Sequence, residues 1–182
     1  MFEKGDEFMG LYAIGDLHFS TENPKPMNIF GDNWDNHEKK IADNWNETVK
    51  DGDTVLVLGD TSWAMNLNEA KADLDIIESL PGKKIFIKGN HDYWWSSLSK
   101  INAAYQSEDM NFIQNGYFTY GDYAICGSRG WLCPNEVKFD EDDEKIYKST
   151  MFFMHLPVGS CMWRERKRLF SIGDIRGRNA AE

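Results

Sequence analysis

Three short apolar runs, each closely followed by a glycine and then Asp or Asn, constrain the fold of this chain most strongly. The runs cover residues 11–14, 54–58 and 84–87. Runs of four or five aliphatic and β-branched residues bounded by glycine are typical of buried strands. Between them, residues 36–50 and 66–80 carry apolar side chains at intervals of three and four, the spacing of a helix. The alternation predicts an α/β fold with largely parallel strands.

The second part of the chain has a different pattern. Its strand-like segments are short and follow one another without an intervening helix, at residues 111–114, 117–120 and 123–126. Gly121 and Asp122 between the last two suit a tight hairpin turn. We therefore expect a β-rich half to follow the α/β half.

Two charged segments lie nearer the C-terminus. Residues 140–144 are five consecutive acids, for which we expect a solvated loop. Five of the six arginines follow residue 150. This bias predicts a surface helix over 162–172 with a frayed end or, alternatively, a basic interaction arm.

Composition indicates an ordinary globular protein. Hydrophobic residues make up 41% and charged residues 27%, which excludes disordered, collagen-like and disulfide-scaffold classes. A length of 182 residues fits one domain, 1–182, in which 151–182 is an atypical tail. The net charge is -10, so a nucleic-acid partner is not expected.

Cysteine usage and hydropathy bear on the compartment. The three cysteines form no Cys-x-x-Cys pair, and the N-terminus has no apolar signal region. No stretch approaches the roughly 18 consecutive apolar residues that a membrane span needs. We expect a cytoplasmic protein without a membrane partner, and the sequence leaves the oligomeric state open.

Polar residues follow each of the first three predicted strands. They are Asp16 and His18, then Asp60, then Asn90, His91 and Asp92. The carboxyl ends of neighbouring strands in an α/β sheet meet at one crevice, so these residues can share a site. Oxygen and imidazole ligands without thiolate suit Mn, Fe, Zn, Co or Ni better than a closed structural zinc site.

Each of these short motifs also has an ordinary structural interpretation. A single Asp-x-His or Gly-Asp after a strand is more typical of a turn than of a metal site. Gly-Asn-His-Asp at 89–92 is harder to explain as a turn alone, although Asp92 by itself suits an Asx turn or a helix cap. Their occurrence together, in this order after three strands, favours a metal site.

The ordered motifs resemble those of the calcineurin-like metallophosphoesterase family. They are Asp16-Leu17-His18, Gly59-Asp60 and Gly89-Asn90-His91-Asp92. Similarity to a small bacterial branch of predicted phosphohydrolases extends through residues 59–64, 89–95 and 126–131, and the resemblance covers about 11–147. It implies a four-layer α/β/β/α sandwich with two divalent metal ions at the strand ends.

The resemblance also implies roles for individual residues. Asp16 and His18 would hold the first ion, Asp60 would bridge both, Asn90 would hold the second, and His91 would donate a proton to the leaving group. Two ions would make the pocket locally positive in an acidic protein. They would activate a bridging water as hydroxide for attack on a small phosphomonoester or phosphodiester.

Other residues near these motifs have two interpretations each. Asp92 could orient the ring of His91, as well as form the turn or cap noted above. Arg129 could bind a substrate phosphate through its planar guanidinium or form a structural salt bridge. Trp94 and Trp95 could stack on a nucleoside or form a wall of the pocket, but we expect them to pack against the following helix. His37 is expected to be solvated.

The C-terminal motifs of the family are incomplete in this chain. His155 follows the apolar run 151–154 and is a candidate ligand of the second ion. The Gly-His-x-His element that should come next is missing, which indicates a truncated or rearranged C-terminus. The expected function is a dinuclear metal-dependent phosphohydrolase with impaired activity or, alternatively, a metal- or phosphate-binding homologue with little turnover.

Overall fold

The computed structural model describes residues 9–129, 139–148 and 168–173. Four parallel strands form the first sheet, in the order β1-β2-β3-β4. They are β1 (Leu11–Ile14), β2 (Thr54–Val57), β3 (Lys83–Ile87) and β4 (Met110–Ile113). The strands predicted over 11–14, 54–58 and 84–87 are confirmed. The parallel order places the carboxyl ends of β1, β2 and β3 at one edge of the sheet.

A second, smaller sheet follows. It contains β5 (Gly116–Tyr120), β6 (Tyr123–Ser128) and β7 (Arg168–Gly173). β5 and β6 form an antiparallel hairpin, and β7 pairs with β6 in parallel. Gly121 at the hairpin turn has a φ of 52°, a conformation that glycine adopts without steric cost.

Three helices lie between the strands of the first sheet. They are α1 (His37–Thr48), α2 (Leu67–Ser79) and α3 (Leu98–Ala104). The first two confirm the helical spacing over 36–50 and 66–80. Asn66 caps α2 by accepting a hydrogen bond from the backbone N–H of Glu69, and Ser97 caps α3 in the same way from Lys100. Two short 3-10 segments, Met27–Phe30 and Asp32–Trp34, precede α1.

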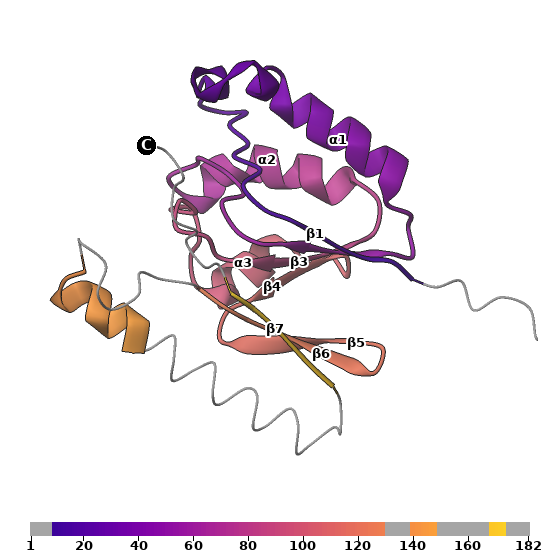
Figure 1. The fold of residues 1–182 in the computed structure, drawn as a ribbon, viewed down its shortest axis with the longest axis vertical. Coiled ribbons are helices and arrows are strands. Elements are labelled where there is room, and N and C mark those ends of the chain that lie inside the picture. The colour runs from indigo at the N-terminus through magenta and orange to yellow at the C-terminus, as the bar shows by residue number, and fades with distance from the viewer. Residues whose placement is uncertain (1–8, 130–138, 149–167, 174–182) are drawn as a thin grey trace, which may run out of the picture.

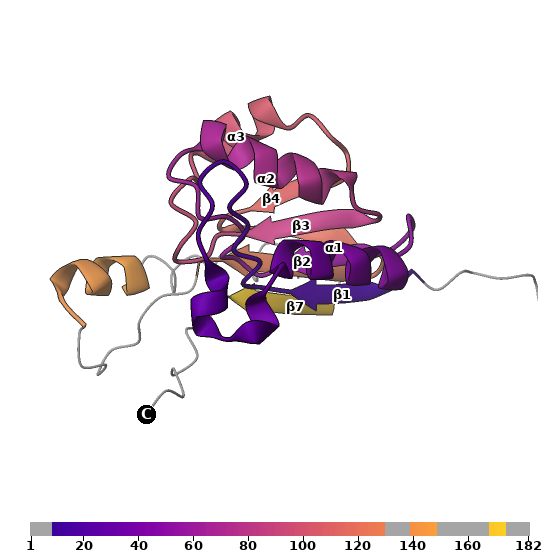
Figure 2. The same ribbon diagram turned by 90° about the horizontal axis from the view of Figure 1, so that it is seen from above.

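The elements stack as layers. Figure 1 shows α1 and α2 over one face of the four-stranded sheet and the three-stranded sheet beneath its other face, and Figure 2 gives the view from above. Val57 and Phe86 face Leu74 and Ile77 of α2, whereas Leu56 and its neighbours on the opposite face pack against the second sheet. The α/β fold is therefore confirmed, and the described residues supply three layers of the expected four-layer sandwich.

Gly127 shows how closely the two sheets approach. A Cβ atom at this position would lie 2.6 Å from the Cγ2 atom of Ile87. The end of β6 therefore lies directly against the end of β3. The second sheet reaches the edge where the candidate residues lie.

Three expectations about individual elements are corrected. The segment expected at 111–114 is β4, and it extends the parallel sheet instead of joining the β-rich part. Residues 141–148 form a helix where the acidic run was expected to be a loop. Asp140 caps it by accepting from the backbone N–H groups of Asp142 and Asp143, both at 2.9 Å.

The third correction concerns the C-terminal helix expected over 162–172. Residues 168–173 are a strand, because the free edge of β6 pairs with them over six residues. Arginine spacing alone does not reveal such a partner. Residues 162–167 lie outside the described part. Among the described residues, no helix combines the length and the apolar character that crossing a membrane requires.

Candidate metal centre

The turns after β1 and β2 hold three predicted ligands in a strained conformation. Asp16, His18 and Asp60 have φ values of 55°, 49° and 52°, in the left-handed region that non-glycine residues seldom adopt. Backbone hydrogen bonds join the two turns, from the N–H of Asp16 to the carbonyl of Gly59 and from the N–H of His18 to that of Asp60. Such strain tends to occur at functional sites, where surrounding contacts maintain it.

The turn after β3 joins the same group through Asp60. The Oδ1 atom of Asp60 accepts a hydrogen bond of 2.8 Å from the backbone N–H of His91, and its Oδ2 atom lies 2.9 Å from His91 Nδ1. Gly89 allows this approach, because a Cβ there would overlap the backbone nitrogen and Oδ1 of Asp60. The Asn90 amide nitrogen also lies 2.9 Å from His91 Nδ1.

His18 is buried, with 8% of its surface exposed, and its Nδ1 atom has no hydrogen-bond partner among the described residues. Its Nε2 atom lies 3.4 Å from Oδ1 of Asp16. That hydrogen bond is the main reason why the pKa of the Asp16 carboxyl lies below its usual value, although partial burial opposes the shift. A buried ring nitrogen without a partner is unusual in proteins and is consistent with a metal ligand.

Three of these side chains could hold one ion together. Ligand atoms of His18, Asp60 and His91 all lie within 4.8 Å of one another. Two imidazoles and a carboxylate match the nitrogen and oxygen preference of Mn, Fe, Co, Ni and Zn. Asp16 is outside this group of three and its side chain is 74% exposed, yet it adjoins the group through His18. The residues present therefore fit a divalent ion.

A family-model match covers the region that contains these three turns. Residues 9–176 match the family model of calcineurin-like phosphoesterases. The chain belongs to the calcineurin-like phosphoesterase family. The resemblance inferred from the three motifs is thus confirmed.

Two curated relatives are similar to this chain over part of their length. An uncharacterized protein of Methanocaldococcus jannaschii, MJ1445, is 39% identical over 111 residues, which cover 60% of this chain and 61% of that protein. The gene 66 protein of Mycobacterium phage L5 is 34% identical over 81 residues, or 44% of this chain and 39% of that protein. The matched part of the chain thus spans less than two thirds of each relative.

A solved structure also resembles this chain. It is the crystal structure of AQ665 from Aquifex aeolicus, described as a protein of unknown function. The TM-score is 0.48 at 23% identity, and the match covers 94% of this chain and 81% of that one.

Asp92 contacts the backbone of the site and not the ring of His91. Its fully buried carboxylate accepts hydrogen bonds of 2.8 to 2.9 Å from the backbone N–H groups of Gly89, Asp60 and Thr61. The indole N–H of Trp94 donates to the same carboxylate at 2.8 Å. Burial raises the pKa of Asp92, and these hydrogen bonds oppose the rise. The carboxylate therefore fixes the turns after β2 and β3 to each other.

The turn after β1 has supports that the sequence did not reveal. Asp73 of α2 is buried and accepts hydrogen bonds from the backbone N–H of Thr21 and from the hydroxyl of Ser62. His37, expected to be solvated, lies with its Nε2 atom 3.1 Å from the carbonyl oxygen of His18. The neighbouring Glu38 accepts from the N–H of Ser20. Helices α1 and α2 thus hold the chain that carries His18.

Two further predicted site residues are Arg129 and His155. Arg129 is half-buried directly after β6. It lies near Lys88, whose pKa is lowered by burial and further by the charge of Arg129. The positive charges of Lys88, directly after β3, and of Arg129, directly after β6, therefore influence each other. His155 lies outside the described residues.

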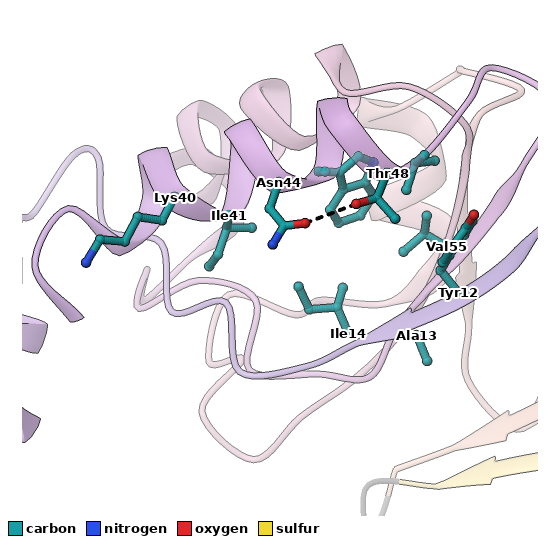
Figure 3. A pocket seen from close by; sticks show the side chains of 10 residues that line it. Tyr12, Ala13, Ile14, Lys40, Ile41, Asn44, Thr48 and Val55 are labelled. Atoms are coloured by element: carbon teal, nitrogen blue, oxygen red, sulfur yellow. Dashed lines mark hydrogen bonds between the residues drawn. The ribbon is translucent and has the colours of Figure 1, made fainter. Parts of the chain in front are cut away.

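A cavity of about 370 Å³ beneath α1 is separate from these residues. Figure 3 shows aliphatic side chains of β1 and β2, including Ile14 and Val55, opposite Ile41 of α1. The polar residues Asn44 and Thr48 in its wall form a hydrogen bond of 3.0 Å with each other. None of the candidate ligands lines the cavity, which offers apolar contacts instead of metal ligands.

Proposed function

We propose that the chain is a metal-dependent phosphohydrolase that cleaves a small phosphomonoester or phosphodiester. The observation that carries this proposal is the convergence of His18, Asp60 and His91 from the ends of three parallel strands, with ligand atoms within 4.8 Å. Membership of the calcineurin-like family supports it, since metal-dependent phosphoester hydrolysis is the activity that this family indicates.

The proposal assigns a metal ligand role to five residues. Asp16 and His18 hold one ion, Asn90 and His155 hold a second, and Asp60 binds both. The donor set favours Mn, Fe, Zn, Co or Ni. When bound, such ions lower the pKa of a water molecule and offset the negative charge of the phosphoester. This matters here because a net charge of -10 would otherwise repel the substrate.

His91 is proposed as the proton donor to the leaving group and not as a metal ligand: of the three side chains whose ligand atoms lie within 4.8 Å of one another, His18 and Asp60 would hold the ion and His91 would lie beside it. Its Nδ1 atom faces Oδ2 of Asp60 and the amide of Asn90, which fix the ring orientation. No hydrogen bond in the described part of the chain involves Nε2, and the side chain is 36% exposed. Nε2 is therefore the atom that would give its proton to the leaving oxygen. General acids of this kind contribute typically 10²–10⁴-fold to the rate.

Arg129 is proposed to bind a substrate phosphate. The nearby ammonium group of Lys88 adds a second positive charge on the same side. A guanidinium binds two phosphate oxygens at once, which suits it to orient the substrate.

The test is hydrolysis of p-nitrophenyl phosphate and bis(p-nitrophenyl) phosphate by metal-free protein to which Mn²⁺, Zn²⁺, Co²⁺, Ni²⁺ or Fe²⁺ is added. We expect turnover with at least one ion, loss of metal and turnover in Asp60→Asn, and loss of turnover with metal retained in His91→Ala. Asp43→Asn on α1 is the control, since Asp43 is exposed and, among the residues that the structure describes, forms an ion pair only with Lys39.

The outcomes separate the candidate functions. Metal binding without hydrolysis of either ester under any ion would support a binding homologue with little turnover. Failure of the wild-type chain to bind any of these ions would contradict both. Preference between the two esters would decide whether the chain acts as a phosphatase or a phosphodiesterase.

A further inference from the structure

The indole of Trp63 adjoins both imidazoles of the candidate centre. Its ring centroid lies 4.7 Å from that of His18, in a stacked arrangement, and 4.8 Å from that of His91. The indole N–H donates to the sulfur of Met27 at 3.3 Å, and Met27 itself is buried. The segment that precedes α1 therefore holds Trp63 in place beside the centre.

The ammonium group of Lys25 lies over the same indole. The Nζ atom of Lys25 lies 4.3 Å from the centroid of Trp63, a distance typical of a cation–π contact. The side chain is exposed, and among the described residues Lys25 has no carboxylate partner. The indole of Trp63 thus contacts this ammonium group as well as the imidazoles of His18 and His91.

The backbone of this segment is restrained around the lysine. Pro24 and Pro26 flank Lys25, and proline fixes its own φ and restricts the residue before it. The backbone N–H of Lys25 donates to the hydroxyl of Ser20 at 3.1 Å. With Met27 buried on the other side, little conformational freedom is left for the segment to lose when a ligand binds.

We propose that Lys25 is a substrate-binding residue whose ammonium group, seated on Trp63, binds a phosphate oxygen of the phosphoester at the metal centre. This inference rests on the proposed function. A hydrogen bond between an ammonium and a phosphate oxygen is charge-assisted and stronger than one between neutral groups. The indole holds the positive charge beside the centre. A carboxylate partner would neutralise that charge, whereas the indole does not.

A purely structural role for Lys25 makes a different prediction. The aliphatic part of the side chain covers the indole whether or not it ends in a charge. Lys25→Met retains that cover and removes the charge, whereas Lys25→Arg retains both. Lys71 of α2 offers a control: it is exposed and its Nζ atom lies 5.7 Å from the ring centroid of Tyr105, but it pairs with Asp75 and lies away from the candidate centre.

The experiment measures Mn²⁺ affinity, the affinity of the Mn²⁺-loaded protein for inorganic phosphate, and kcat and KM for the better of the two nitrophenyl esters. For Lys25→Met we expect phosphate affinity to fall, and KM to rise, by about ten- to hundredfold, the value of a lost charge-assisted hydrogen bond. kcat and Mn²⁺ affinity should change by less than about twofold. Lys25→Arg and Lys71→Met should resemble the wild type.

The possible failures are distinguishable. Equal phosphate affinity in Lys25→Met and Lys71→Met would overturn the role of Lys25 and leave the proposed function standing. A loss of Mn²⁺ affinity in Lys25→Met would also overturn it, because the lysine would then support the centre and not the substrate. Absence of metal binding by the wild type would overturn both proposals.

Discussion

The two sides of the candidate centre are supported in different ways. The turns after β2 and β3 share one fully buried carboxylate, Asp92, which accepts from the backbone of both. The turn after β1 is linked to β2 by backbone hydrogen bonds and is otherwise supported from the helices, by His37, Glu38 and Asp73. Asp16 on this side has a side chain that is 74% exposed, whereas that of Asp60 is 10% exposed.

This difference shows that the turns after β2 and β3 are fixed directly to the ends of their strands. The turn after β1 is held mainly by contacts from the helices. Asp60 and His91 are fixed by groups that cannot move without disrupting the ends of β2 and β3. Asp16 can adjust its side chain, and its carboxylate is open to solvent. We therefore expect substitutions on the β2–β3 side to have larger effects on both stability and metal binding.

The largest effect is expected for Asp92→Ala. It leaves three short backbone N–H donors and the Trp94 indole without their buried acceptor, and each unsatisfied group costs about 1–3 kcal/mol. We expect unfolding free energy to fall by more than about 3 kcal/mol, as measured by urea denaturation of the metal-free protein. Asp122→Ala in the exposed β5–β6 turn is the control. A loss below about 1 kcal/mol would mean that Asp92 does not brace the turns.

Metal affinity should show the second-largest difference between the two sides of the centre. Asp60→Asn removes the charge of the ligand proposed to contact both ions, and Asp16→Asn removes that of an exposed ligand of one ion. We expect Mn²⁺ affinity to fall by more than about a hundredfold for Asp60→Asn and by about tenfold for Asp16→Asn, or roughly 2.7 and 1.4 kcal/mol. Isothermal titration of metal-free protein measures both. Equal losses would show that burial does not set the contribution of each ligand.

Gly89→Ala tests the close contact between the turns. Its Cβ would overlap the backbone nitrogen and carboxylate of Asp60, so the turns must separate. We expect a loss of stability of about 1–3 kcal/mol together with weaker Mn²⁺ binding. Gly52→Ala, where a Cβ would meet nothing within 4 Å, should leave both quantities unchanged. Unaltered metal binding in Gly89→Ala would indicate that the position of Asp60 is not critical.

The smallest effect is expected on the β1 side, for Glu38→Gln. The amide oxygen can still accept from the backbone N–H of Ser20, so only the charge-assisted part of this bond is lost. We expect stability to fall by less than about 1 kcal/mol and Mn²⁺ affinity to change by less than about threefold. Thermal unfolding and metal titration check these values. A loss as large as that of Asp92→Ala would remove the distinction between the two sides.

Local sequence pattern correctly predicted the strands and helices whose own residues carry the pattern of that structure. The strands over 11–14, 54–58 and 84–87 are largely apolar runs, each closely followed by glycine, and the helices α1 and α2 carry apolar residues at helical spacing. Residues 168–173 were predicted as part of a helix, but they form a strand. This strand depends on pairing with β6, which lies far away in the sequence, and local pattern does not show such a partner. β4 was assigned to the wrong part of the fold for the same reason, since its neighbour is β3.

The candidate site shows the same division. The three motifs identified Asp16, His18 and Asp60 because a ligand type directly after a strand is visible in the sequence. The contacts of Asp92 were not predictable, since its partners Asp60 and Thr61 are backbone groups about thirty residues away. The position of His37 against His18 likewise depends on where α1 packs, for which the sequence has no local signal.

A crystal structure of the chain soaked with Mn²⁺, with anomalous diffraction data collected at a wavelength where manganese scatters anomalously, tests the shared metal centre most directly. We predict an anomalous peak within about 2.0–2.3 Å of both an Asp60 carboxylate oxygen and a His18 ring nitrogen. Saturating Mn²⁺ with no peak beside Asp60, or peaks only at surface carboxylates such as those of the 141–148 helix, would contradict it.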